Sequence, residues 1–226
     1  MKLVFAGLDE PLELPAGECV TLEVENQTLF TRLALSLRSL EGRFAAEPYS
    51  LWEDDEELKP SETLLVIDNP LSLPWDERVL MGRIVKQMER EFLEDEDLRQ
   101  AVEGMQAAMD AKLMSLGLGM NADFAFANNW EFKKYLKFAG FGVDYQETRP
   151  FLDNLLNFLS LTLDAGDHRV LVFVNLKTFL SKNDFEAMLE HVLYQKTRVL
   201  LIENKCDEYN YSHEHKRAID LHFLES

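Results

Sequence analysis

The sequence has few cysteines and no long apolar run. Its 226 residues contain two cysteines, Cys19 and Cys206, which form no disulfide framework and suit a reducing compartment. No apolar stretch approaches the roughly 20 residues of a membrane-spanning helix, and the first residues lack a signal-peptide pattern. These absences predict a cytoplasmic protein with no membrane partner.

Catalytic motifs are also missing. Neither Gly-x-Ser-x-Gly nor His-Glu-x-x-His occurs, and His168 and His191 are isolated. Cys206, His213 and His215 fit no standard zinc spacing, and a polar loop before the last strand explains them more simply. We therefore expect that the protein is not an enzyme.

The glycine-rich loop that binds nucleotide phosphates is absent too. Leu-Leu-Val-Ile-Asp at residues 64–68 is similar to the metal-binding strand of nucleotide hydrolases. The loop that should precede it is replaced by Val-Glu-Asn-Gln-Thr at residues 24–28, which has neither glycine nor lysine. We expect no bound nucleotide, and a degenerate hydrolase with Asp68 as its metal ligand remains an alternative.

Basic residues are scarce, with 23 against 41 acidic ones and a net charge of −18. Taken over the whole chain, this balance argues against nucleic acid as a partner. The charge is unevenly distributed, because residues 1–74 carry −10 and residues 141–226 carry −5, while residues 75–140 carry only −3. A basic surface is therefore best sought in the middle of the chain.

Two apolar runs rich in branched residues lie near the end of the chain, at residues 170–174 and 199–202. Neither alternates polar with apolar residues, so both read as strands buried on two faces, and a helical pattern containing Phe185 and Met188 separates them. Ser181, Asn183 and Asp184 are candidate caps for that helix. The pattern predicts a parallel strand–helix–strand unit.

The first third of the chain predicts further strands and one helix. Short strands are expected at residues 3–5, 12–14 and 20–24, joined by turns as a hairpin or meander. Asn26 and Thr28 can cap a helix that ends near Gly42, and the five acids at residues 53–57 read as a solvated loop. Residues 218–224 should form a last strand at a sheet edge.

The middle of the chain reads as helical. From Asp76 to Leu116 apolar residues recur at helical spacing, as one long helix or as two with a joint at the acidic residues 94–97. A shorter helix is expected at residues 129–139, and Thr148 and Pro150 should start another. We predict a discontinuous α/β head domain, residues 1–74 and 141–226, and an inserted helical leg domain, residues 75–140.

Lys133, Lys134 and Lys137 lie close together on the short helix, interleaved with aromatic residues. One interpretation is an amphipathic helix with solvated lysines. The other is a surface that follows DNA phosphates, which needs only point charges along one face. Three lysines would bind weakly in a monomer, but a symmetric oligomer would repeat them around an opening.

Asp123, together with Asn121, Asn128 and Asn129, could offer oxygen ligands to a hard cation such as calcium. Only one of the four is charged. A polar loop that caps the following helix explains the same residues equally well.

The order and spacing of several segments resemble one family, the small CRISPR-associated protein of type II-A systems. The similar segments are Leu-Asp-Glu-Pro-Leu-Glu-Leu (8–14), Leu-Lys-Pro-Ser-Glu-Thr-Leu-Leu-Val-Ile-Asp (58–68), Tyr-Leu-Lys-Phe-Ala-Gly (135–140), Arg-Val-Leu-Val-Phe-Val-Asn (169–175), Thr-Phe-Leu-Ser (178–181) and Arg-Val-Leu-Leu-Ile-Glu-Asn (198–204). They span essentially the whole chain, although none is a catalytic motif.

This resemblance implies a mixed-sheet α/β head that is similar to a P-loop hydrolase fold but lacks the phosphate loop, plus a helical leg. It implies a non-enzymatic homotetrameric ring whose opening takes double-stranded DNA ends without sequence preference. The implied role is spacer acquisition in antiviral defence, beside the CRISPR integrase complex and the RNA-guided effector nuclease. A scaffold that serves the acquisition machinery without binding DNA is a further alternative.

The resemblance also suggests site residues. Lys137 matches a family lysine in the helix that faces the opening, helical geometry adds Lys133 and Lys134, and Arg32 and Arg38 on the first helix are further candidates. Family members hold structural calcium with several acids just before that helix. Here only Asp123 remains, so calcium would need fewer side chains and more backbone oxygens.

Overall fold

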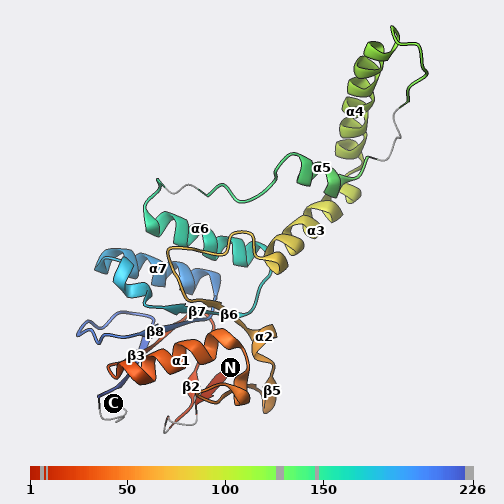
Figure 1. Ribbon diagram of the computed structural model, residues 1–226. Coiled ribbons are helices and arrows are strands. Elements are labelled where there is room, and N and C mark those ends of the chain that lie inside the picture. The colour runs from red at the N-terminus through yellow and green to blue at the C-terminus, as the bar shows by residue number, and fades with distance from the viewer. Residues whose placement is uncertain (6–7, 9, 126–129, 146–147, 222–226) are drawn as a thin grey trace. The chain divides into compact units, whose positions relative to one another are not determined.

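The computed structural model describes residues 1–5, 8, 10–125, 130–145 and 148–221. The chain divides into two compact units, Met1–Trp75 with Tyr145–Ser226, and Asp76–Asp144. The expectation from sequence placed these boundaries after residues 74 and 140. In Figure 1 the first unit runs from red to orange and again from cyan to blue, and the second is yellow to green.

The first unit contains a five-stranded sheet in the order β6-β7-β8-β3-β9, in which all neighbours are parallel. Its strands are β3 (Cys19–Val24), β6 (Leu64–Ile67), β7 (Val170–Val174), β8 (Val199–Glu203) and β9 (Glu214–Ile219). Every residue of β3, β7 and β8 is buried, as the unbroken apolar runs of β7 and β8 predict. The predicted parallel strand–helix–strand unit is confirmed.

A second sheet in this unit is antiparallel, in the order β2-β1-β4-β5. Its strands are β1 (Lys2–Phe5), β2 (Leu12–Glu13), β4 (Tyr49–Glu53) and β5 (Glu56–Leu58). The α/β class is therefore confirmed, and the two strand directions lie in separate sheets. The expected meander is wrong for residues 20–24, because this wholly buried segment belongs to the parallel sheet.

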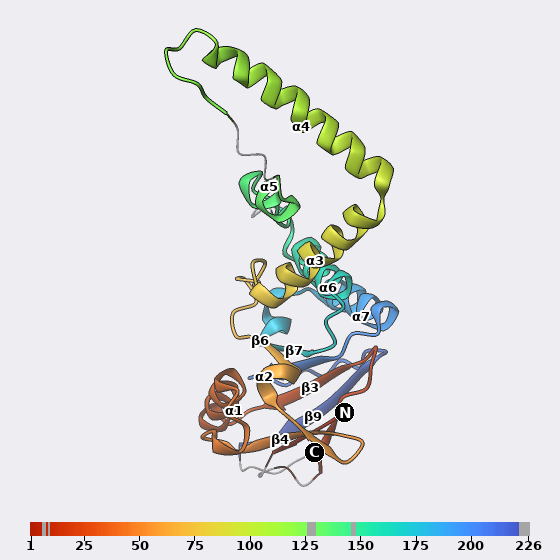
Figure 2. The same cartoon turned by 90° about the vertical axis from the view of Figure 1, so that its right-hand side faces the viewer.

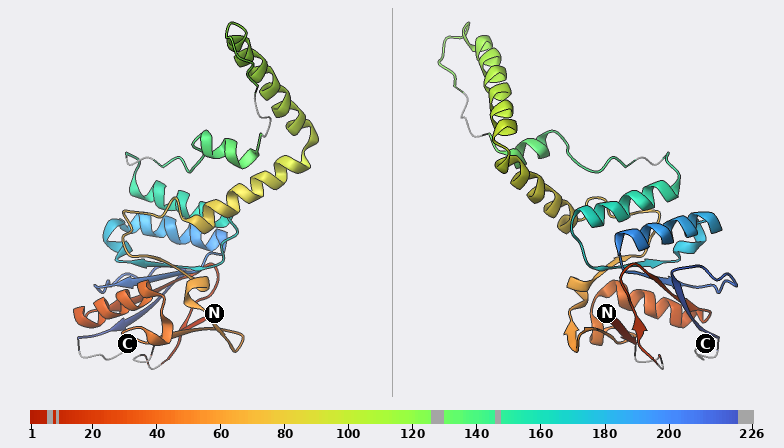
Figure 3. Two further views of the ribbon diagram at one scale, coloured as in Figure 1. Left: turned by 45° about the vertical axis from the view of Figure 1, so that its right-hand side comes forward. Right: turned by 180° about the vertical axis from the view of Figure 1, so that it is seen from behind.

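The parallel sheet is covered on both faces. Val170 and Val172 belong to one core cluster with Leu3 and Leu51 of the small sheet and Leu37 of α1. The alternate residues Leu171 and Phe173 point to the opposite face and are also buried. Helices α6 and α7 cover that opposite face (Figures 1 and 3).

The helices of this unit differ in how they begin, since only α1 and α7 of its described helices have a side-chain cap. The unit's helices are α1 (Gln27–Ser39), α2 (Pro60–Thr63), α6 (Phe151–Asp164) and α7 (Lys182–Gln195), with short 3-10 turns η1 (Gly42–Phe44) and η2 (Leu176–Phe179). Ser181 and Asp184 form a reciprocal capping box at α7, which confirms two of the three predicted caps. Helix α6 starts directly after Pro150, as expected.

Two sequence expectations need correction here. The acidic run is a hairpin and not a loop, because Glu53 ends β4, Glu56 begins β5, and the intervening Asp54 and Asp55 have φ of 46° and 66°. Aspartate tolerates this left-handed conformation, which a two-residue hairpin turn requires. The last strand is Glu214–Ile219 at the edge, not residues 218–224, of which 222–224 lie outside the described residues. Its polar, partly exposed sequence hides its strand character.

The second unit consists of helices α3 (Arg78–Glu94), α4 (Glu96–Gly117) and α5 (Phe132–Phe138), drawn in yellow to green in Figure 2. The joint expected at residues 94–97 is confirmed, because Asp95 lies between α3 and α4 and its side chain accepts from Leu98 N at 2.9 Å. Helix α5 is shorter than the predicted 129–139, and residue 129 lies outside the described residues.

Candidate nucleic-acid interface

Helix α5 packs against α3 through aromatic rings. Phe92 of α3 is 5% exposed and its ring centroid lies 4.8 Å from that of Phe132 and 5.3 Å from that of Trp130. Tyr135 and Phe138 instead point outward, with 51% and 87% of their surface exposed. The aromatic residues interleaved with the lysines therefore have two roles, since some fasten the helix and others are exposed beside the charges.

The three predicted lysines share this short helix, but their electrostatic settings differ. The Nζ atom of Lys133 lies 2.7 Å from Oε2 of Glu89 on α3, and that of Lys134 lies 2.7 Å from Oε1 of Glu131. Lys137 is exposed and forms no ion pair with any residue that the structure describes. Its ammonium group is therefore the one of the three that is fully available to an incoming anion.

Arg32 and Arg38 lie in the other unit, on α1. Arg32 pairs with Glu47 at 2.8 Å, and Arg38 pairs with Asp68 at 3.1 Å. Six residues separate them, which at about 100° per residue places them on different faces of the helix. The structure therefore does not bring these two arginines together, and each already has an acidic partner.

Sequence reasoning missed three basic residues of α3. Arg83, Lys86 and Arg90 recur at i, i+3 and i+7, so they lie on one face, and all three are exposed. They line an open depression of about 600 Å³ together with Gln87 and Leu93. Their spacing can be read from the sequence, but no aromatic residues are interleaved with them as they are with the lysines of α5. We call Arg83, Lys86 and Arg90 the basic stripe.

The position of a phosphate loop is occupied by a helix cap. Oδ1 of Asn26 accepts from Thr28 N at 3.1 Å and from Leu29 N at 3.0 Å, so these amides are already bound. Asp68, the metal ligand of the alternative hydrolase hypothesis, pairs with Arg38. Both arrangements disfavour a nucleotide at this end of β3, because the amides and the carboxylate that it needs are bound by the chain itself.

Beside β3 and β8 the chain has a buried charge network. Lys177 Nζ lies 2.6 Å from Glu214 Oε1 and 2.7 Å from Asp207 Oδ2, and Lys177 N donates to Glu203 Oε1 at 3.0 Å. Burial raises the pKa of Glu203 to about 7, despite that backbone hydrogen bond and the nearby ammonium group. Most polar atoms of these groups are paired within the network, although Glu214 Oε2 has no hydrogen-bond partner among the described residues, so we interpret it as a structural network.

Only two of the four predicted calcium ligands, Asn121 and Asp123, lie in the described part of the chain. Asp123 is exposed, Asn128 and Asn129 lie outside the described residues, and no group of three or more His, Cys, Asp or Glu side chains suited to a metal occurs among the residues described. The described residues therefore show no carboxylate-rich metal site, and the expectation of calcium beside Asp123 stays a prediction. Cys206, His213 and His215 also form no metal-binding group in the described part of the chain, since His215 lies in β9 and pairs with Glu18.

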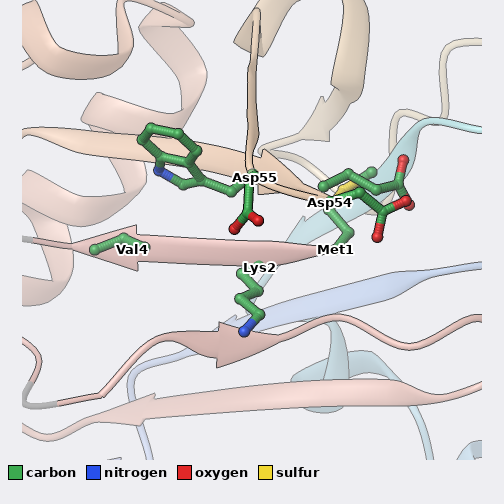
Figure 4. Close-up of a pocket in the computed structure, with 7 residues that line it drawn as sticks. Met1, Lys2, Val4, Asp54 and Asp55 are labelled. Carbon is green, nitrogen blue, oxygen red and sulfur yellow. The ribbon is translucent and has the colours of Figure 1, made fainter.

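A pocket of about 510 Å³ lies on the small sheet, and its charge does not suit DNA. Its lining includes the carboxylates of Glu53, Asp54 and Asp55, with Lys2 as its basic member (Figure 4). Lys2 is itself paired with Glu13 at 3.2 Å. The excess of negative charge repels phosphate, so the candidate interface lies on the helical unit.

The comparisons with known proteins agree with this fold. No curated protein matches the sequence. The crystal structure of Stu0660 of Streptococcus thermophilus superposes with a TM-score of 0.56 at 16% identity, covering 97% of this chain and 75% of that one. A putative ABC transporter ATP-binding protein from Pyrococcus furiosus gives 7% identity and a TM-score of 0.39, covering 96% of this chain and 97% of that one. This similarity is too low to support a conclusion about fold or function.

A family model decides the assignment. The model described as CRISPR-associated protein (Cas_Csn2) matches residues 46–220, which is well over half of the chain. This match confirms the resemblance noted in the sequence segments, which include residues 135–140 and 169–175. The chain with the lysine-bearing helix α5 and the strand–helix–strand unit in its head therefore belongs to the Cas_Csn2 family of CRISPR-associated proteins.

Proposed function

We propose that this protein is a non-enzymatic homotetrameric ring that binds double-stranded DNA ends, without sequence preference, during CRISPR spacer acquisition in antiviral defence. The observation that carries the proposal is the exposed lysine set of α5 in a member of this family, above all Lys137, whose ammonium group forms no ion pair with a described residue. Exposed cations without base-reading contacts suit the phosphate backbone, which is the same for every sequence.

The net charge of −18 sets a condition on this function. Screening limits repulsion between exposed charges to about 8–10 Å at ordinary salt, so acids elsewhere on the chain need not prevent binding. The helical segment is the least acidic third, and a ring repeats its lysines around one opening. Multivalency then raises an affinity that a single copy would not reach.

The same proposal includes the partners that the family resemblance implies. These are the CRISPR integrase complex and the RNA-guided effector nuclease, in the cytoplasm, with calcium as a further candidate ligand. None of the helices in the described part combines the length and apolar character needed to cross a bilayer.

Gel-shift assays with matched linear and sealed circular duplexes test this proposal. We expect binding of the linear duplex, no binding of the circle, and loss of binding when Lys133, Lys134 and Lys137 are changed together to Glu. Sedimentation with and without calcium should give the mass of a tetramer. Equal binding of circles, an unaffected triple variant or a monomeric mass would overturn the ring mechanism, and a wild-type protein that binds no DNA would favour a scaffold role.

A nucleotide hydrolysis assay addresses the alternative enzyme. We expect no turnover from the wild-type protein, because the amides at the start of α1 are capped by Asn26 and Asp68 is paired with Arg38. Hydrolysis that Asp68→Ala abolishes would contradict the non-enzymatic function and support a degenerate hydrolase.

A further inference from the structure

The basic stripe of α3 is a second exposed cationic surface in the helical unit. Arg83, Lys86 and Arg90 occupy one face, flanked along the same face by Val79 and Leu93, which are 45% and 57% exposed. None of these five residues is buried in the structure. The face is therefore accessible for its whole length and needs a partner of matching charge.

We infer that the basic stripe binds the phosphate backbone of the same duplex DNA as α5, as a contact surface separate from the α5 lysines. This inference rests on the proposed function, because it assigns further residues to the DNA that the protein is proposed to bind. It divides the interface of each subunit into two parts, one on α5 and one on α3.

The charge around the stripe supports this assignment. Glu89, one of the two acids that line the depression, is neutralised by Lys133 at 2.7 Å. Lys86 and Arg90 form no ion pair with another described residue. Glu94 is the remaining acid that lines the depression, so the cations are in excess there.

The spacing of the stripe also suits one DNA strand. Seven residues separate Arg83 from Arg90, which corresponds to roughly 10 Å along a helix axis. Three phosphate steps of one strand span about the same distance along the duplex axis. Phosphates three steps apart on one strand can thus lie beside the two ends of the stripe without strong bending of either partner.

The composition of the stripe favours backbone contacts over base reading. Its polar members are one Lys and two Arg on a single straight face, and no aromatic ring lies among them to stack on an unpaired base. Such a surface follows phosphates through point charges and bidentate guanidinium groups. The expected ligand is intact duplex, in agreement with binding that ignores sequence.

The stripe can be tested by comparing the double variant Lys86→Gln/Arg90→Gln with wild type on a linear duplex over a range of salt concentrations. We expect affinity to fall about tenfold at low salt, and the slope of log K against log salt to shrink by about 2 per subunit engaged. The matched control is Lys59→Gln/Lys205→Gln, which removes the same charge from exposed positions of the other unit and should leave the slope unchanged.

The outcomes separate the two proposals. If wild type binds DNA and the double variant behaves like the control, the inference about the basic stripe is wrong and the proposed function still holds. Wild type that does not bind overturns both. A variant whose sedimentation mass falls while its salt slope stays at the wild-type value also overturns the inference, because the face then serves a protein contact. The single variant Lys86→Glu provides a second test if the double variant does not fold.

Discussion

Lys133 on α5 forms a 2.7 Å ion pair with Glu89 on α3, next to the ring stack of Phe92 and Phe132. The Lys133 side chain is 53% exposed and that of Glu89 is 30% exposed. An ion pair so open to solvent contributes little to stability, about 0–1 kcal/mol. Its main effect is to hold the Lys133 ammonium group against α3 and to reduce the charge that it offers to DNA.

Among the α5 lysines, Lys137 should matter most for DNA binding. Lys137→Gln is expected to weaken binding of a linear duplex roughly three- to tenfold at low salt, because its ammonium group has no carboxylate partner among the described residues. Lys134→Gln should change affinity less than about twofold, since Glu131 already neutralises Lys134. Fluorescence anisotropy titrations measure both, and a larger effect at Lys134 would contradict the ranking.

Phe92 should be the main determinant of how firmly α5 is held. Phe92→Ala removes a ring that is 5% exposed and contacts both Trp130 and Phe132, and we expect a loss of about 3 kcal/mol in the stability of the helical unit. Trp130 fluorescence followed through urea unfolding reports the change. Leu116→Ala on α4, where the side chain is 70% exposed, is the matched control and should be nearly neutral.

Stability should depend on pH through Glu203. Its pKa is raised by burial from 4.5 to about 7, so the folded state binds more protons than the unfolded state between these values. Stability therefore falls as pH rises from about 4.5 to 7, by an amount on the order of 3 kcal/mol relative to a neutral side chain. Glu203→Gln should remove this dependence, because its amide oxygen can still accept from Lys177 N.

Urea unfolding at pH 5 and pH 8 gives the free energy of unfolding of wild type and of Glu203→Gln. The variant should be more stable than wild type by a larger margin at pH 8 than at pH 5. The exposed Glu190→Gln on α7 is the control and should follow the wild-type curve. If the free energies of unfolding of the two proteins differ by the same amount at both pH values, the raised pKa of Glu203 is contradicted.

Helix α4 carries an exposed apolar stripe that fits the proposed tetramer. It has no buried residue, and Met105, Met109 and Leu113 are 66%, 55% and 45% exposed at helical spacing. A stripe of this length is unusual on a monomer. Met105→Glu/Met109→Glu should therefore lower the mass measured by sedimentation equilibrium, whereas Glu103→Gln on the same helix should not. An unchanged mass in the double variant would place the subunit contacts elsewhere.

The sequence was sufficient for the elements whose burial is simple. Unbroken apolar runs predicted β7 and β8, and helical spacing predicted α3, α4 and the joint at Asp95. It failed for β9 and for the acidic hairpin, because an edge strand and a charged turn look like loop when tertiary pairing is unknown.

The candidate site was predicted less completely. Local spacing placed Lys133, Lys134 and Lys137 on one helix, but it could not show that Glu89, 44 positions before Lys133, neutralises one of them. The partners of Arg32 and Arg38 are likewise distant in sequence. The basic stripe could have been found from its spacing, since it needs no tertiary information.

The position of β3 in the parallel sheet has a consequence for synthesis. Cys19 of β3 pairs with Val199 of β8 and with Glu214 of β9, so both neighbours of this strand come from the end of the chain. During synthesis, β3 stays unpaired while the whole helical unit is made, because that unit lies between β3 and its partner strands in the sequence. The α/β unit closes only when the last strands emerge, and until then the apolar residues of β3 lack their sheet partners.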